Sequence, residues 1–164
     1  MKQSTSGHIA LEKIVVNSGI GRLATSHAQF EEKMLPELEK QFAAIVGQKP
    51  SLRVARHSIA GFKIRAGTPV GLTATLRGRR MKDFFMKFVN VVLPRTRDFR
   101  GIDPHAIDHS GNLSIGIKDI VVFPETNPES QLNFGMECTF VVSHARGRDD
   151  AFAFYRTSGI LFRS

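Results

Sequence analysis

Apolar and polar residues follow two different patterns along this chain. In the first, every second residue is apolar or the residues are mainly β-branched, which is typical of strands with one buried face. The strands predicted in this way are residues 12–17, 51–56, 72–77, 113–117, 120–123 and 135–143. The last of these is the longest, and the first ends in a Ser-Gly-Ile-Gly turn at 18–21.

In the second pattern apolar residues recur every three or four positions, which predicts an amphipathic helix over residues 26–46. Ser26 to Gln29 has the form of a capping box, and Gly47 is a stop signal. We expect Pro36 to kink this helix or to end a first segment, because proline lacks the amide donor and crowds the preceding turn. The apolar face consists of Phe30, Met34, Leu38, Phe42 and Ile45.

Two more helices are predicted in the second half of the chain. The segment 81–93 is strongly apolar and is closed by Pro94, and residues 149–155 form a short helix with acids in its first turn. Between the predicted elements, residues 58–71 contain too much Gly and Pro for regular structure and are expected to form an extended basic loop. Residues 95–112 and 124–130 are further connections.

Strands and helices alternate without a βαβ repeat, so the pattern favours an α+β fold, with an antiparallel sheet, helices packed on one face and long basic loops. We expect a flexible tail at residues 1–8. A single domain should follow at 9–164, with an N-terminal part of about 9–65 and a C-terminal part of about 66–164. No apolar run is long enough for a membrane span, and a cytoplasmic location is expected.

The positive charge of the chain belongs to one segment. The formal net charge is +8, and residues 40–82 contain ten Lys or Arg and no Asp or Glu. The remaining chain has 13 basic and 15 acidic residues, a net charge of −2. With a pI of about 10.2, this segment favours a nucleic acid as the partner, although the charge count alone fits a solvated face equally well. The one cysteine, Cys138, excludes an internal disulfide and is expected to be buried and inert.

The arrangement within the basic segment favours RNA. Phe62 stands between Gly61 and Lys63 in the predicted loop, where an exposed ring flanked by cations suits stacking on an unpaired base or packing against a ribose. The aromatic signature of common RNA-recognition modules is absent. Recognition of a folded RNA by its shape and backbone is therefore favoured over reading of a single strand.

Two motifs suggest other chemistry, and both are weak. Gly19 to Ala24 has the form G-x-G-x-x-A between a strand and a helix, as in a dinucleotide site, but the next strand ends in Arg56 instead of an acid. His105 and His109 flank Asp108, but the surrounding Pro and Gly disfavour a helix and no third metal ligand is evident. No cofactor, metal site or enzyme is predicted. A nucleotide-binding enzyme that uses 19–24, or a non-specific RNA chaperone, remains an alternative.

Several short motifs, in order along the chain, resemble the universal large-subunit ribosomal protein that binds 5S rRNA, the L-five family. The string P-R-x-R-D-F-R-G at 94–101 is the most specific of them, and the resemblance covers about residues 9–163. The other motifs are EKIVVNSG (12–19), GQKP (47–50), SIAGFKIR (58–65), GLTATLRG (71–78) and FPE (123–125).

The resemblance implies a monomeric, non-enzymatic component of the cytoplasmic ribosome, located in the central protuberance between 5S and 23S rRNA. In the family, the loop equivalent to 58–67 reaches toward P-site tRNA, and another surface bridges to a protein of the small-subunit head. The residues implied to contact 5S rRNA are Asn17, Gln48, Phe62 and Thr75. Those implied to contact rRNA through the basic motifs are Lys49, Arg77, Arg95, Arg97 and Arg100, and those implied to contact tRNA are Ser58, Gly61, Lys63 and Arg65.

Three features depart from the family pattern. The segment before the first strand is short, His57 stands where a basic residue is usual, and the G-R-G-N pattern becomes His109-Ser-Gly-Asn112 without its Arg. Phosphate contacts at the last two places are not implied.

Overall fold

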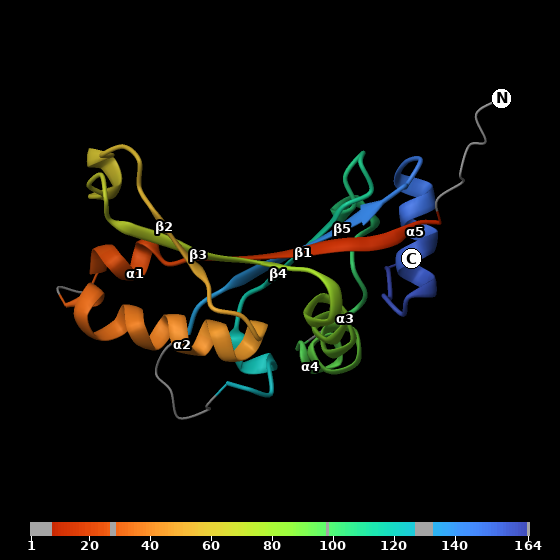
Figure 1. The fold of residues 1–164 in the computed structure, drawn as a ribbon, viewed down its shortest axis with the longest axis horizontal. Helices are drawn as coiled ribbons and strands as arrows, with labels where there is room; N and C mark the ends of the chain where they lie inside the picture. Colours follow the sequence, from red (N-terminus) through yellow and green to blue (C-terminus); the bar gives the residue numbers. More distant parts are fainter. Residues whose placement is uncertain (1–7, 27–28, 98, 127–132, 164) are drawn as a thin grey trace.

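The fold is built around a five-stranded antiparallel sheet, seen in a computed structural model that describes residues 8–26, 29–97, 99–126 and 133–163 (Figure 1). The order of the strands across the sheet is β2-β3-β1-β5-β4. Their bounds are β1 Ala10–Gly19, β2 Ser51–Val54, β3 Pro69–Leu76, β4 Leu113–Ile117 and β5 Met136–Ser143. The expected α+β class, with an antiparallel sheet, is confirmed. β1 lies between β3 and β5, so strands from both predicted parts of the domain share one sheet.

Five of the six predicted strands are present, and the sixth is wrong. Residues 120–123 contain a 3₁₀ turn, Ile120–Val122, in place of a strand. Ile120 and Phe123 are buried while Val121 is 61% exposed, so the apolar residues that enter the core are three positions apart. This spacing matches a 3₁₀ turn and not the two-residue repeat of a strand.

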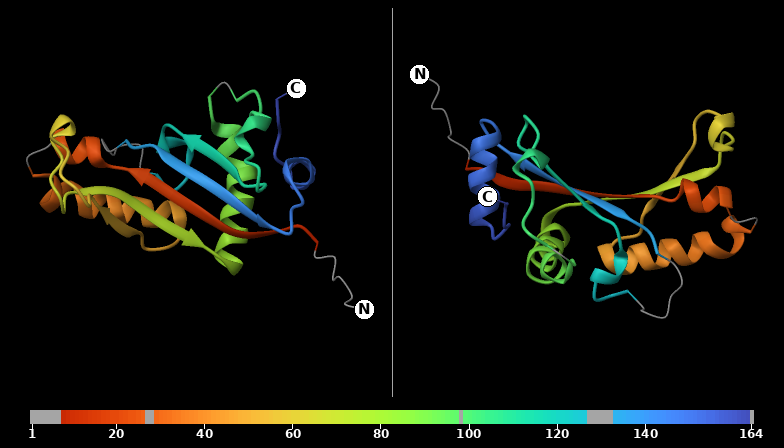
Figure 2. Two further views of the ribbon diagram at one scale, coloured as in Figure 1. Left: turned by 90° about the horizontal axis from the view of Figure 1, so that it is seen from above. Right: turned by 180° about the vertical axis from the view of Figure 1, so that it is seen from behind.

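The main helices lie on one face of the sheet, and the two views of Figure 2 show the other face open. α2 (Leu35–Val46), α3 (Gly78–Lys87) and α4 (Leu93–Arg95) run under the sheet. The short α1 (Gly21–Ser26) follows β1 at one end of the molecule, and α5 (Arg148–Thr157) packs at the other end. α5 is tied to β5 by the buried Tyr155 hydroxyl, which lies 2.8 Å from the Phe140 carbonyl oxygen.

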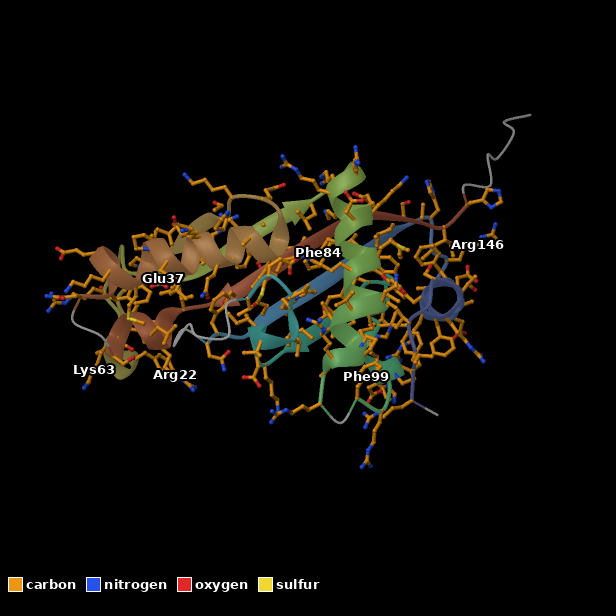
Figure 3. The ribbon with its side chains drawn as sticks, turned by 90° about the horizontal axis from the view of Figure 1, so that it is seen from below. Arg22, Glu37, Lys63, Phe84, Phe99 and Arg146 are labelled. Atoms are coloured by element: carbon orange, nitrogen blue, oxygen red, sulfur yellow. The ribbon has the colours of Figure 1, made fainter. Side chains whose placement is uncertain are left out.

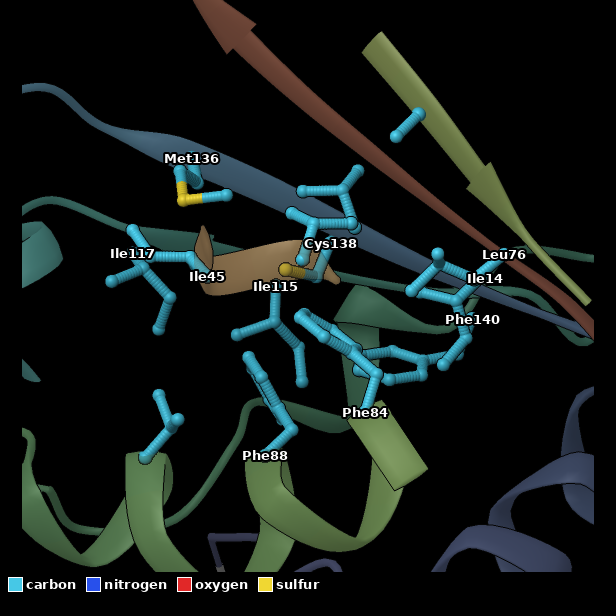
Figure 4. Packing of buried hydrophobic residues seen from close by; sticks show 14 of the residues in the cluster. Ile14, Ile45, Leu76, Phe84, Phe88, Ile115, Ile117, Met136, Cys138 and Phe140 are labelled. Carbon is cyan, nitrogen blue, oxygen red and sulfur yellow. The ribbon is translucent and has the colours of Figure 1, made fainter. Parts of the chain in front are cut away.

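The core fills the space between the sheet and these helices (Figure 4). Alternate residues of β1 are completely buried at Ile14 and Val16, as a strand with one covered face requires. Phenylalanine provides most of the aromatic contacts, as its abundance suggests. The ring of Phe88 lies 5.1 Å from that of Phe140 in β5 and 6.1 Å from that of Phe84 in α3 (centroid to centroid).

The predicted helix 26–46 begins differently from expectation. Ser26 is the last residue of α1, and its hydroxyl donates to the Arg22 carbonyl at 2.7 Å, so it ends one helix instead of capping the next. The middle of the proposed capping box, residues 27–28, lies outside the described residues. A π-helical turn, Phe30–Met34, precedes α2, and Gly47 ends α2 in the left-handed conformation with φ 76°.

Both Leu-Pro pairs follow a π-helical turn. Leu35-Pro36 follows the turn Phe30–Met34, and Leu93-Pro94 follows a second π-helical turn, Phe88–Val92. Each proline occupies the first turn of a new α-helical segment, where no amide donor is needed. The backbone is helical on both sides of the change from π to α, at Met34 and at Leu35, so Pro36 does not end a first segment, which was one of the two predicted outcomes. Pro94 does not close its helix, which continues to Arg95.

The long connection 95–112 is held close to the fold. A 3₁₀ turn, Pro104–Ala106, lies within it, and isolated bridges join Ile102 to Phe162 and Ile107 to Leu113. The expected flexibility of residues 1–8 and most of the predicted loop 124–130 lie outside the described residues.

Candidate nucleic-acid interface

The open face of the sheet carries small and polar side chains. Strands β1, β3 and β5 expose alternate residues there, because successive side chains of a strand point to opposite sides. One cross-strand row consists of Ser51, Thr73, Asn17, Glu137 and Gly116, and the next consists of Thr75, Val15, Thr139 and Ser114. This surface offers hydroxyl and amide groups and the carboxylate of Glu137.

Asn17 lies in the middle of the open face with its side chain oriented by a neighbour. The Thr73 hydroxyl donates to the Asn17 Oδ1 oxygen at 2.6 Å. This bond directs the Asn17 Oδ1 toward β3, so the Nδ2 amino group points away from β3 and can donate to a ligand. The adjacent row has a similar hydroxyl contact, 3.0 Å, between Ser114 and Thr139.

Gln48 lies next to Thr75, although 27 residues separate them in the sequence. α2 ends at the left-handed Gly47, and the chain then turns so that the Gln48 Nε2 donates to the Thr75 carbonyl at 3.2 Å. Arg80 donates to the Gln48 Oε1 at 3.3 Å. Of the four residues implied to contact 5S rRNA, Asn17 and Thr75 thus lie in neighbouring rows of the open face, and Gln48 lies beside the main chain of Thr75.

Cations border this surface on the side of β2 and β3. Lys49 follows Gln48 and is exposed, and Arg53 lies on β2 beside Gly71. Arg77 follows β3 and lies 3.5 Å from Glu12, and both side chains are about half exposed. An exposed pair of this kind contributes little to stability, so Arg77 can exchange its partner for a phosphate at small cost.

The basic loop predicted at 58–71 is a hairpin that extends β2 and β3. Its two sides are joined by the Ala55 amide donating to the Thr68 carbonyl at 2.9 Å and by a bridge between Ile59 and Ile64. The tip is a 3₁₀ turn, Ala60–Phe62, followed by Lys63 in the left-handed conformation with φ 54°. β3 begins at Pro69, so the irregular part is shorter than predicted.

The residues implied to contact tRNA all lie in this hairpin. Gly61, Lys63 and Arg65 are exposed at or near the tip, and Figure 3 shows Lys63 at one end of the molecule. Ser58 has an internal contact, because its hydroxyl oxygen accepts a hydrogen bond from the Ala66 amide at 2.9 Å. Its hydroxyl therefore helps to hold the two sides of the hairpin together.

Phe62 belongs to the hairpin and not to the sheet surface. It stands between Gly61 and Lys63 at the tip, beyond the ends of β2 and β3, and it is 70% exposed. The sequence grouped it with Asn17, Gln48 and Thr75, but the structure does not bring it beside them. The exposed ring can stack on a base.

Of the other predicted rRNA-binding residues, Arg95 and Arg97 lie near β4, at the opposite edge of the sheet from β2. Arg95 ends α4, and together with Arg97 and Lys118 it lines a cleft of about 800 Å³ that also includes Asp119. Arg100 follows along the chain and is exposed. The predicted rRNA-binding residues therefore fall on separate surfaces, the open sheet face and the β4 side, in addition to the hairpin tip.

The suspected dinucleotide motif, Gly19 to Ala24, lacks the expected surroundings. The helix after β1 is the six-residue α1, and the strand reached next along the sheet, β3, is antiparallel to β1. The Ile20 amide donates to the Val70 carbonyl at 3.0 Å, so the turn after β1 is hydrogen-bonded to β3. Without a parallel βαβ unit the motif does not form the crevice in which such sites bind a dinucleotide.

The Asp108 carboxylate fixes the loop that contains His105 and His109. The Asp108 carboxylate accepts from the amides of Ser110 and Asn112 at 2.8 and 2.9 Å. Partial burial acts to raise the pKa of Asp108, but the hydrogen bonds from Asn112 and Ser110 outweigh it and hold the pKa below its usual value. Across the described ranges, no group of three or more His, Cys, Asp or Glu is arranged to hold a metal ion.

Cys138 is completely buried in β5, as expected for an inert thiol. Burial raises its pKa to about 12, so the reactive thiolate is not formed near neutral pH. No helix in the described part of the chain is long and apolar enough to cross a membrane.

The sequence alone missed several residues of the open face. Thr73, Thr139, Ser114 and Glu137 were not singled out, because each looks like an ordinary polar position in a strand. The alternation in each strand predicted which residues share a face. The register between strands, which sets Thr73 and Glu137 on either side of Asn17, could not be read from one strand at a time.

Two family models match this chain over most of its length. Residues 7–65 match the family described as ribosomal protein L5, and residues 69–162 match the model for the C-terminus of the same ribosomal family. The chain is 46% identical over 134 residues to the large ribosomal subunit protein uL5 of Thermotoga maritima, covering 81% of this chain and 70% of the relative. It is 42% identical to uL5 of Anaeromyxobacter sp. strain Fw109-5 over 154 residues, or 93% of this chain and 82% of the relative. The uL5 protein of Halothermothrix orenii is 41% identical with the same coverage.

Proposed function

We propose, from the premise that the chain belongs to the ribosomal protein L5 family, that its open sheet face binds 5S rRNA. The family match makes the chain a protein of the large ribosomal subunit, with a cytoplasmic, ribosomal location. Its family consists of structural proteins. That this chain works without catalysis and without a cofactor is part of the proposal.

The observation that carries the proposal is the uncharged network on the open face, bordered by cations. Asn17, Thr73 and Thr75 present amide and hydroxyl groups on adjacent strands, and Gln48 is fixed beside them by its bond to the Thr75 carbonyl. The minor groove of A-form RNA is wide and shallow and displays ribose 2′-hydroxyls, which such groups can bind. Lys49 and Arg77 at the border would neutralise phosphates.

We extend the proposal to the hairpin, which we assign to P-site tRNA. Its support is the combination of an exposed Phe62 ring with Lys63 and Arg65 on a projection that stands apart from the sheet surface. Cations can hold the backbone of a folded RNA while the ring packs against a base or a ribose. The Ser58 to Ala66 bond and the bridge below the tip keep this projection in one shape.

The β4 side is proposed to contact 23S rRNA, so that the protein attaches 5S rRNA to the rest of the subunit as a monomer. Arg95, Arg97 and Lys118 supply the charge at one cleft, and Arg100 is exposed three residues after Arg97 in the sequence. A bridge to a protein of the small-subunit head is also proposed, on the family resemblance alone.

The test is direct binding to 5S rRNA with the full chain, measured by filter binding at several salt concentrations. We expect saturable binding with log K falling linearly against log salt, with a slope of about 5 for about six phosphate contacts. Gln48→Ala and Thr75→Ala should each weaken binding severalfold without lowering the melting temperature by more than a few degrees. Thr157→Ala, on the exposed side of α5, is the matched control and should bind like the wild type.

Chemical footprinting of 5S rRNA separates this proposal from the remaining alternative. A defined set of protected nucleotides is expected. Equal affinity for 5S rRNA and an unrelated duplex, without a defined footprint, would instead indicate a non-specific RNA chaperone and would overturn the proposal.

A further inference from the structure

Glu137 is an acidic residue in the middle of the proposed RNA-binding face. It is exposed on β5, directly opposite Asn17 of β1 on one side and Gly116 of β4 on the other. Within the described part of the chain, no hydrogen bond or ion pair engages its carboxylate. A negative charge at this position repels the phosphates of any RNA that docks there. Its presence is explained if the carboxylate makes a contact that compensates for this repulsion.

The surface around Glu137 is a shallow depression of about 480 Å³ lined by Asn17, Lys118 and three glycines. Gly19 lies in β1, Gly116 lies in β4 and Gly135 directly precedes β5. At these three positions no side chain of the residue itself covers the backbone. A side chain placed on Gly19 or Gly116 would meet no other atom within 4 Å, which shows that the space above both residues is open. A ligand edge can therefore approach the Glu137 carboxylate and the Asn17 amide closely.

The chemistry of the two facing groups defines the ligand. A carboxylate can only accept hydrogen bonds, whereas the Asn17 Nδ2, left free when Oδ1 accepts from Thr73, can donate. Among the base edges in a minor groove, an adenine-containing pair presents only acceptors, and guanine adds the exocyclic N2 amino group as a donor; in RNA the ribose 2′-hydroxyls are the other donors in the groove. A guanine thus presents a donor beside the N3 acceptor, which matches a carboxylate beside an amide.

We propose that Glu137 accepts a hydrogen bond from the N2 amino group of a guanine in the minor groove of the bound RNA, while Asn17 donates to an adjacent acceptor. Glu137 is then the residue that gives the sheet face a preference for sequence, in addition to shape. The inference rests on the proposed function, because it requires the open face to bind RNA.

The experiment is analogue interference mapping with 5S rRNA, since the guanine is not known in advance. Inosine, which differs from guanosine only in lacking the 2-amino group, is incorporated at random as its phosphorothioate. RNA bound by the full chain is separated from free RNA, and the positions depleted in the bound fraction are read by iodine cleavage. For the wild type we expect depletion at one or a few guanosines by about tenfold, as for one lost hydrogen bond to a charged group.

The variants tie that depletion to the carboxylate. Glu137→Ala should abolish the inosine depletion at the contacted guanosine and leave all other positions unchanged. Glu137→Gln keeps an accepting oxygen at the same place and should retain part of the depletion. Glu37→Gln, on α2 on the opposite side of the molecule, removes the same charge and should leave the map unchanged (Figure 3).

Three results would overturn the inference. One is an identical inosine map for the wild type and Glu137→Ala, with both proteins binding 5S rRNA. Another is a Glu137-dependent depletion that is seen with 2′-deoxy analogues and not with inosine, which would show that the carboxylate binds a ribose hydroxyl. The third is loss of all 5S binding in both Glu137 variants while their melting temperatures stay unchanged, which would make the residue a general contact. Failure of the wild type itself to bind 5S rRNA specifically would overturn the proposed function, and this outcome is seen before any variant is compared.

Discussion

Thr73→Val tests whether the hydrogen bond to Asn17 prepares the open face for RNA. Valine has nearly the shape of threonine and is at least as favourable in a strand, so β3 should keep its place between β1 and β2. The substitution removes the donor of the 2.6 Å bond to the Asn17 Oδ1, after which the Asn17 amide can rotate. We therefore expect an effect on RNA binding without a matching effect on folding.

The magnitude follows from the kind of bond that is lost. A neutral, partly buried hydrogen bond contributes about 0.5–1.5 kcal/mol, which corresponds to a roughly 2- to 12-fold weaker affinity if the bound state needs the orientation that the bond provides. Filter binding to 5S rRNA at one fixed salt concentration measures this factor. The free energy of unfolding, measured by urea denaturation, should change by less than about 1 kcal/mol.

A double-mutant cycle with Asn17→Ala separates this mechanism from a direct contact of Thr73 with RNA. If Thr73 acts only by orienting Asn17, Thr73→Val has no further effect once Asn17 is alanine. Losses that simply add would refute the reasoning, and so would wild-type affinity for Thr73→Val when Asn17→Ala binds weakly.

Three further predictions concern the hairpin, the attachment of α5 and the loop at Asp108. Lys63→Ala combined with Arg65→Ala should preserve 5S binding and impair tRNA-dependent steps on the ribosome, and a loss of 5S affinity in this double variant would contradict the assignment of the hairpin. Tyr155→Phe should lower the free energy of unfolding by about 1–3 kcal/mol, because it leaves the buried Phe140 carbonyl without its hydroxyl partner. Each kcal/mol lowers the melting temperature of a chain of this size by about 2–4 °C, so a decrease of less than a degree would argue against this role. The pKa of Asp108 is lowered from 3.8 in the folded state, so its carboxylate stabilises the fold above that pH, and the advantage is lost as the pH falls through the folded-state pKa. The difference in unfolding free energy between the wild type and Asp108→Ala should accordingly be largest near neutral pH and should shrink as the pH falls below 3.8, and a difference that does not vary with pH would exclude this role.

Local patterns predicted most of the fold for a simple physical reason. A strand with one covered face alternates and an amphipathic helix repeats at 3.6 residues, so segments such as 72–77 and 135–143 identify themselves without their partners. The prediction failed where an apolar run was short. The segment 120–123 contains three apolar residues and one aromatic, and only the surrounding core decided that Ile120 and Phe123 would be buried three positions apart.

Pro94 is a second case in which the local sequence did not predict the structure. From the sequence, Pro94 ends a helix because its ring crowds the preceding turn. The structure inserts a π-helical turn before it, and the helix continues. Pro94 lies in the first turn of the new α-helical segment, where its missing amide donor is not needed, so the helix includes it and ends at Arg95.

The residues of the candidate site show the same difference between what the sequence predicts and what the folded chain decides. The sequence by itself determined that residues 40–82 carry the positive charge and that short motifs resemble one family. That resemblance selected Asn17, Gln48, Phe62 and Thr75 as the residues to examine. Tertiary structure alone decided which of them meet: Gln48 reaches Thr75 because Gly47 turns the chain, Phe62 projects away with the hairpin, and Glu137 is set beside Asn17. The physical reason is that charge and alternation are properties of single segments, whereas the register of one strand against another is fixed by the packing of the whole sheet.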